Sequence, residues 1–233
     1  MILVNKIDEI LPLEGEAGGR LGRHVEHDDR SWGFTQPEFR PEELVSVEWP
    51  RQCPIFDQGN IGSCTGNAIA GAIGTDSMWG SGRSIIDKEW AMDLYRSATH
   101  LDNIPGHMPP DDTGSSGIAA CKAARKAGLI DSYKHAFTLN AALSALQRGP
   151  AIVGMTWLTG CDSPDVEGMI DYSGTIRGGH EVLLRGCDMI GSMLFLDNSW
   201  SCDWGRNGSF RMTFDAFKIA MGLQGDVTIP IWS

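Results

Sequence analysis

Residues 55–73 read IFDQGNIGSCTGNAIAGAI, a glycine-broken loop followed by a run of small residues. Ala, Gly and Ile recur at helical spacing after Cys64, which predicts a helix from residue 64 to about 78. Glycines weaken such a helix by roughly 1 kcal/mol each relative to alanine, so we expect it to be packed on all sides. A helix N-terminus lowers the pKa of a thiol, so Cys64 is a candidate nucleophile, with Gln58 six residues before it. A buried structural thiol beside a turn is the alternative.

The bulk composition narrows the classes of partner. The 233 residues carry a formal net charge of −11, and no Lys/Arg stripe offers phosphate contacts, so we expect no nucleic-acid partner. No apolar run is long enough for a membrane span, and Lys6, Asp8 and Glu9 interrupt the apolar start before a signal-peptide core could form. We therefore expect no membrane partner and, by default, a cytoplasmic location.

The cysteines suggest neither a zinc site nor a complete disulfide framework. They form no CxxC pair and no Cys/His spacing typical of zinc, so we expect no metal and no cofactor. If Cys64 is free, the other five cannot all pair within one chain. Reduced thiols fit best, although a disulfide such as Cys187 with Cys202, on adjoining strands, stays open.

Helical and strand patterns are segregated along the chain. Residues 86–100 and 117–129 are predicted helices, the second ended by Gly128, and a further helix begins with Asn140 as N-cap and stops at Gly149. After residue 150, short apolar or alternating runs between Gly, Asp and Asn predict antiparallel strands. This order favours an α+β fold with a site between a helical and a β lobe.

The first 48 residues differ from the rest. Residues 1–48 are polar, acidic and rich in turn residues, which predicts an extended arm that packs on the body through Trp32 and Phe34. A short cleavable inhibitory segment is the alternative. The remaining chain divides into a helical lobe at about 49–139 and a mainly β lobe at about 140–233.

A base and an orienting amide are present in the second half. Among the histidines, His180 opens an apolar strand directly after two glycines, where another backbone or a substrate could approach closely. Asn198 follows another apolar strand, and an amide beside a histidine can accept its ring N–H and fix the tautomer. Trp200 would shield that bond from water. A structural histidine and a hairpin asparagine beside a core tryptophan are the alternatives.

Four segments, in this order, resemble those of the papain-like cysteine peptidases. DQGNIGSC resembles the glutamine-to-cysteine loop of the family, and LQRGPAIVGM its helix-to-strand junction. GGHEVLLRGCD resembles the Gly-His strand, and DNSWSCDWGRNGSFRM the Asn-Ser-Trp run that follows. The matched segments extend from residue 54 to about 214.

The resemblance implies a two-lobed papain-like fold, with a helical N-terminal lobe whose central helix starts at Cys64, a β-barrel-like antiparallel C-terminal lobe, and the active-site cleft between them. It implies that Cys64 is the nucleophile, His180 the base and general acid, Asn198 the residue that orients the imidazole, Gln58 an oxyanion donor, and Trp200 a lid. Substrate contacts are expected from Gly62, Ser63, Gly114, Ser115 and Gly179.

The chain also departs from the family pattern. Ile61 replaces a cysteine that normally ties down the loop, so that disulfide is absent, and Thr65 replaces the usual aromatic residue. Glu181 follows the histidine, and we expect its carboxylate to raise the pKa of His180. The lack of a long helical proregion resembles bacterial or viral members.

The predicted function is a cysteine endopeptidase that hydrolyses a polypeptide through an acyl-enzyme thioester. A cell-wall peptide amidase uses the same chemistry on another target, although no wall-binding repeat or basic patch is present. A catalytically silent relative used for binding or assembly is the third possibility. The sequence sets no oligomeric state.

Overall fold

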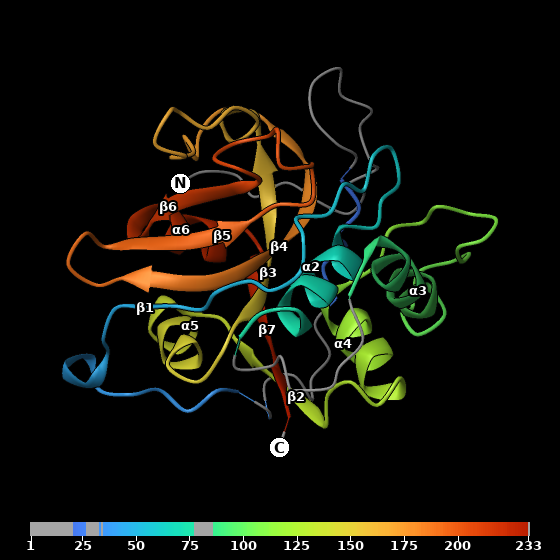
Figure 1. Cartoon of the computed structure of the whole chain (residues 1–233), viewed down its shortest axis with the longest axis horizontal. Coiled ribbons are helices and arrows are strands. Elements are labelled where there is room, and N and C mark those ends of the chain that lie inside the picture. Colours follow the sequence, from blue (N-terminus) through green and yellow to red (C-terminus); the bar gives the residue numbers. More distant parts are fainter. Residues whose placement is uncertain (1–20, 27–32, 34, 77–85, 233) are drawn as a thin grey trace, which may run out of the picture.

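A computed structural model describes residues 21–26, 33, 35–76 and 86–232. A helical layer and an antiparallel sheet lie side by side, with the helical layer at the right of Figure 1 and most of the sheet to its left. Trp32 and Phe34, through which the arm was expected to pack, lie outside the described residues.

The helical layer is formed by α2 (Cys64–Ile73), α3 (Lys88–Thr99) and α4 (Gly117–Lys126). Every residue of α2 is buried, which confirms the expected central helix, but it ends at Ile73 rather than near 78. The helix stops at Gly74, where an added Cβ would collide with the Cys53 side chain. α4 ends just before Gly128, whose φ of +70° favours glycine.

Two further helices accompany the sheet, α5 (Leu139–Leu146) and α6 (Phe214–Gly222). The predicted N-cap of α5 was wrong, because Thr138 accepts the hydrogen bond from the Ala141 N–H. The Asn140 amide instead donates to Glu38 Oε2 at 2.7 Å. The sequence did not predict α6.

The sheet has the order β2–β7–β3–β4–β5–β6, with β1 paired to β4. The predicted strands are β3 (Ala151–Leu158), β4 (Ile176–Asp188), β5 (Met193–Asp197) and β6 (Ser209–Thr213); those not predicted are β1 (Val47–Glu48), β2 (Ser132–Ala136) and β7 (Asp226–Ile231). The path runs from β2 to β6 without closing, so the expected barrel-like lobe is instead an open sheet. β2, from the half expected to be helical, pairs with β7 and forms one end of this sheet.

β3 and β4 separate two hydrophobic cores. Trp157 and Phe210 belong to the core shared by the sheet, α5 and α6, whereas Ile152 and Leu183 pack into the core of α2, α3 and α4. Burial on both faces explains why β3 is a continuous apolar run. β4 thus lies between the two layers and brings its first residues to the start of α2.

None of the helices in the described ranges combines the length and apolarity needed to cross a bilayer.

Candidate active site

Cys64 is the first residue of α2 and has no exposed surface. Burial raises the pKa of its thiol to about 12, and the charge of Glu181 acts in the same direction. The backbone N–H groups of Glu181, Gly22 and Thr65 oppose that shift. These contacts place the thiol between the helix start, β4 and the arm.

His180 lies on β4, opposite Met155 of β3, and is fully buried. Its ring packs against Trp157 and Trp200, at centroid distances of 4.8 and 5.0 Å. Nε2 donates to Asn198 Oδ1 at 2.7 Å, and Nδ1 is buried without a hydrogen-bond partner among the described residues. Because the carbonyl oxygen of Asn198 requires a proton on Nε2, Nδ1 carries the lone pair of the neutral ring.

The pKa of His180 shifts in the direction opposite to expectation. Burial lowers it to about 4, and the charge of Arg177 adds to this, whereas the bond to Asn198 works against it. The expected effect of Glu181 was wrong because neighbouring residues of a strand point to opposite faces. His180 faces Trp157 and Trp200, whereas Glu181 lies against the start of α4.

Asn198 and Gln58 are joined through Ser199. Asn198 Oδ1 also accepts the Ser199 N–H at 2.8 Å, which fixes the amide orientation. The Ser199 hydroxyl donates to Gln58 Oε1 at 2.6 Å, and Gln58 Nε2 donates to the Ile61 carbonyl at 2.8 Å. The structure therefore gathers the predicted residues Gln58, Cys64, His180, Asn198 and Trp200 around one point.

Residues 21–26 of the arm lie across this point (dark blue, by the start of α2 in Figure 1). The Ser115 N–H donates to the Gly22 carbonyl and the His24 N–H to the Ser115 carbonyl, each at 2.8 Å. The Arg23 N–H donates to the Gly179 carbonyl at 3.0 Å. An added Cβ at Gly22 would collide with the Gly62 backbone. The arm thus occupies the walls on which a substrate was expected.

The arm is also held by side chains. Glu26 accepts from the Ser116 hydroxyl at 2.5 Å and from Asn103 Nδ2 at 2.6 Å. His24 Nε2 bonds to the Thr113 carbonyl at 2.7 Å.

Ser63, expected to contact substrate, instead accepts from Asn67 Nδ2 at 3.0 Å. No sequence signal separated residues 21–26 from the rest of the arm.

No family model and no curated protein matches the sequence. Among solved structures, xylellain, a cysteine protease from Xylella fastidiosa, superposes with a TM-score of 0.72 at 18% identity, covering 97% of this chain and 100% of its own. The chain has the papain-like fold. Procathepsin L 3 of Tenebrio molitor (TM-score 0.62, 17% identity, 91% and 75% covered) has the same fold. So does procathepsin B S9 of Trypanosoma congolense (0.61, 12%, 90% and 86%).

All the cysteines of this papain-like fold are free, and only Cys202 is exposed. The disulfide considered between Cys187 and Cys202 is therefore not formed. Within the described ranges, no three His, Cys, Asp or Glu side chains group together in a way that could hold a metal ion.

A carboxylate network holds the loop before Cys64. Asp112 Oδ2 accepts the Gly62 N–H at 2.9 Å, and Oδ1 accepts the Tyr95 hydroxyl at 2.5 Å. Tyr95 in turn accepts the Gly114 N–H at 3.0 Å. This network links both walls of the cleft close to Ile61, where the resemblance implied a missing disulfide. Asp112 and Tyr95 were not predicted from the sequence.

We expect Asp112→Ala to lower the free energy of unfolding by about 1–3 kcal/mol, because it leaves the buried Gly62 N–H and the Tyr95 hydroxyl without their acceptor. Urea unfolding measures the change. Asp111→Ala removes the exposed neighbouring carboxylate and is the matched control. Equal effects of the two substitutions would contradict the role of this network.

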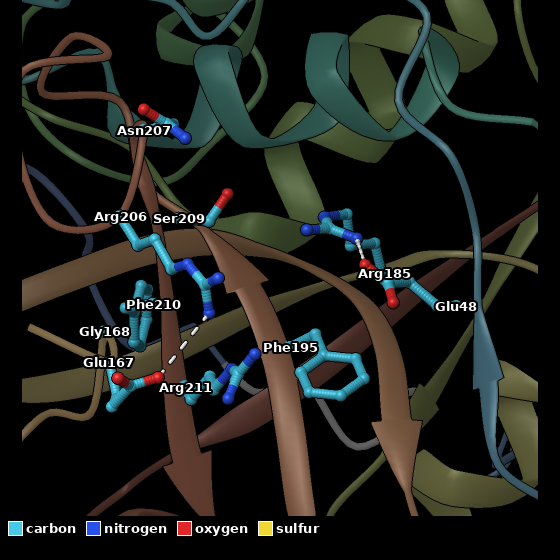
Figure 2. A pocket seen from close by; sticks show the side chains of 10 residues that line it. All are labelled: Glu48, Glu167, Gly168, Arg185, Phe195, Arg206, Asn207, Ser209, Phe210 and Arg211. Carbon is cyan, nitrogen blue, oxygen red and sulfur yellow. Dashed lines mark hydrogen bonds and ion pairs between the residues drawn. The ribbon is translucent and has the colours of Figure 1, made fainter.

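A separate hollow lies on the sheet between β1 and β6 and contains none of these residues. Figure 2 shows two of its arginines turned toward acidic neighbours. Arg185 Nη1 pairs with Glu48 Oε1 at 2.5 Å, and Arg206 Nη1 with Glu167 Oε2 at 3.9 Å. Its lining contains neither a cysteine nor a histidine, and its Ser209 hydroxyl donates to Asp197 Oδ1 at 2.8 Å, so the candidate active site is the point covered by the arm.

Proposed function

We propose that the chain is a cysteine endopeptidase that residues 21–26 hold in a latent state. One observation carries the proposal: His180 Nε2 is bonded to Asn198 Oδ1 at 2.7 Å, while Nδ1 is left without a hydrogen-bond partner among the described residues. A histidine base held in this tautomer can accept a proton only at Nδ1, so it needs a proton donor there. The backbone N–H of Glu181, the next residue of the strand, already reaches the Cys64 thiol.

The reaction follows from these positions once the arm has left. His180 Nδ1 takes the thiol proton, and the Cys64 thiolate attacks the scissile carbonyl carbon. The Cys64 N–H and the Gln58 amide hold the oxyanion that forms. The imidazolium then protonates the leaving amine as the C–N bond breaks, which leaves a thioester. Water, deprotonated by His180, attacks the thioester and releases the carboxylic acid and the thiol.

The position of the arm accounts for the latent state. The Cys64 thiol contacts the Gly22 N–H rather than the carbonyl carbon of a peptide bond. Arg23 pairs with Ser115 in parallel orientation. Burial also keeps both partners neutral, since it raises the thiol pKa to about 12 and lowers the His180 pKa to about 4. Several of the similar solved structures are those of proforms or precursors. These points favour the inhibitory segment over an arm that only packs on the body.

Site-resolved alkylation tests the proposal. In a chain with the arm loosened by Arg23→Ala, we expect iodoacetamide at pH 6 to label Cys64 quickly, because His180 stabilises its thiolate. Adding His180→Ala should slow the labelling of Cys64 and leave that of Cys202, the exposed thiol, unchanged. Peptide mass spectrometry measures both rates. A Cys64 rate indifferent to His180 would favour the silent relative.

A further inference from the structure

The side chain of Arg23 fills a closed acidic pocket. Only 5% of Arg23 is exposed, although it belongs to an arm that lies on the surface of the two layers. Its Nη2 lies 3.0 Å from Asp226 Oδ1 and donates to the Gln224 carbonyl at 2.9 Å. Its Nε lies 3.9 Å from Glu181 Oε2. The pocket therefore holds a guanidinium on carboxylates from β4 and β7.

Glycines make the room that this side chain needs. An added Cβ at Gly154 of β3 would collide with Arg23 Nε and lie 2.6 Å from Asp226 Oδ1. At Gly117, the start of α4, it would lie 2.7 Å from Glu181 Oε1. The body of the protein, not the arm, thus shapes the pocket.

Two carboxyl groups face the guanidinium in this pocket, so its polar lining suits a cation. The Glu181 side chain is fully buried, and neither of its oxygens accepts a hydrogen bond from a described residue. Burial and the charge of Asp226 raise the pKa of Glu181, while Arg23 lowers it. When the arm leaves, the two carboxyl groups lose the guanidinium that faces them, and two neighbouring buried carboxyl groups favour a cation over a neutral or anionic group. A cationic side chain that enters restores the pairing.

The position of the pocket fits a substrate side chain. Gly22 lies at the Cys64 thiol, and Arg23 is the next residue, with its backbone bonded to Gly179 and flanked by the bonds of Ser115. An extended peptide held by the same backbone groups places one side chain at this pocket, whichever direction its chain runs. That side chain belongs to the residue next to the one at the Cys64 thiol.

We propose that this is the specificity pocket of the cleft and that it takes an arginine or lysine side chain of the polypeptide substrate, paired with Asp226 and Glu181. The inference rests on the function proposed above. Arg23 is then an internal stand-in for the substrate side chain. Arginine is preferred to lysine, because Nη2 reaches Asp226 and the Gln224 carbonyl while a second nitrogen, Nε, faces Glu181, and a lysine side chain has a single nitrogen.

Binding tests the pocket without catalysis. In the full chain carrying Arg23→Ala, N-acetyl-argininamide should raise the melting temperature, whereas N-acetyl-citrullinamide, its neutral isostere, should not. Asp226→Asn in the same chain should weaken binding of the arginine compound on the order of 30-fold, as expected for the loss of one partner of a buried charge pair. Equal shifts with both compounds, or none with either, would overturn the proposal. Arg23→Gln serves if Arg23→Ala does not fold.

Hydrolysis separates this inference from the proposed function. Coumarin peptides with arginine, citrulline or leucine at each of the last two residues before the dye should be cleaved fastest with arginine at one position, and Asp226→Asn should remove that preference. Cleavage without preference for arginine over citrulline overturns the pocket and leaves the peptidase standing. Selective binding of the arginine compound without any hydrolysis keeps the pocket as a binding site for basic side chains and overturns the peptidase.

Discussion

Arg23→Ala is expected to raise the alkylation rate of Cys64 in the native chain by roughly 10²–10³-fold, because breaking a buried ion pair costs about 3–5 kcal/mol and each 1.4 kcal/mol is tenfold. The cost falls only on the covered state, since Arg23 pairs with Asp226 and Glu181 only while the arm lies in the cleft. The population with an accessible thiol therefore grows by that factor.

Timed labelling at fixed pH, followed by peptide mass spectrometry, measures this release. Arg40→Ala is the matched control, because Arg40 belongs to the same arm but makes only exposed ion pairs with Glu42 and Glu43. The labelling of Cys202 reports whether the substitution changes thiol reactivity elsewhere. A Cys64 rate that rises no more with Arg23→Ala than with Arg40→Ala would show that Arg23 does not keep the cleft covered.

Cys64→Ala, placed in the Arg23→Ala chain, is expected to lower peptide hydrolysis by at least about 10⁴-fold. Removing the nucleophile of a hydrolase whose catalytic residues act as a unit costs on the order of 10⁶ in turnover. His180→Ala should cost nearly as much, because without the base the thiol stays protonated at neutral pH. Adding His180→Ala to Cys64→Ala should then have little further effect.

Initial rates with a coumarin peptide measure these losses. Cys121→Ala is the matched control, since Cys121 is another fully buried thiol of the helical layer but lies within α4 rather than at the first residue of a helix. If Cys64→Ala retained the activity of Cys121→Ala, the nucleophile would have to be sought elsewhere in the chain.

The residues of the candidate site could be predicted because they lie in local patterns. The small-residue run after Cys64 predicts a helix that must be buried, and α2 is buried throughout. The apolar strands that carry His180 and lead to Asn198 could be recognised in the same way. β7 was missed because Pro230 breaks its pattern, and β2 because Lys134 and His135 lie in it.

The sequence by itself was enough to predict the chemistry proposed for the chain, since the order and flanks of Gln58, Cys64, His180 and Asn198 are local features. Tertiary structure alone decided whether the site is covered and whether its groups are charged. It brought Arg23, Glu181 and Asp226, far apart along the chain, into one pocket and laid the arm over the thiol. It also turned Glu181 away from His180, and burial favours the neutral forms of both Cys64 and His180. Burial and charge pairing depend on what packs around a group, and residues distant in the sequence supply that packing.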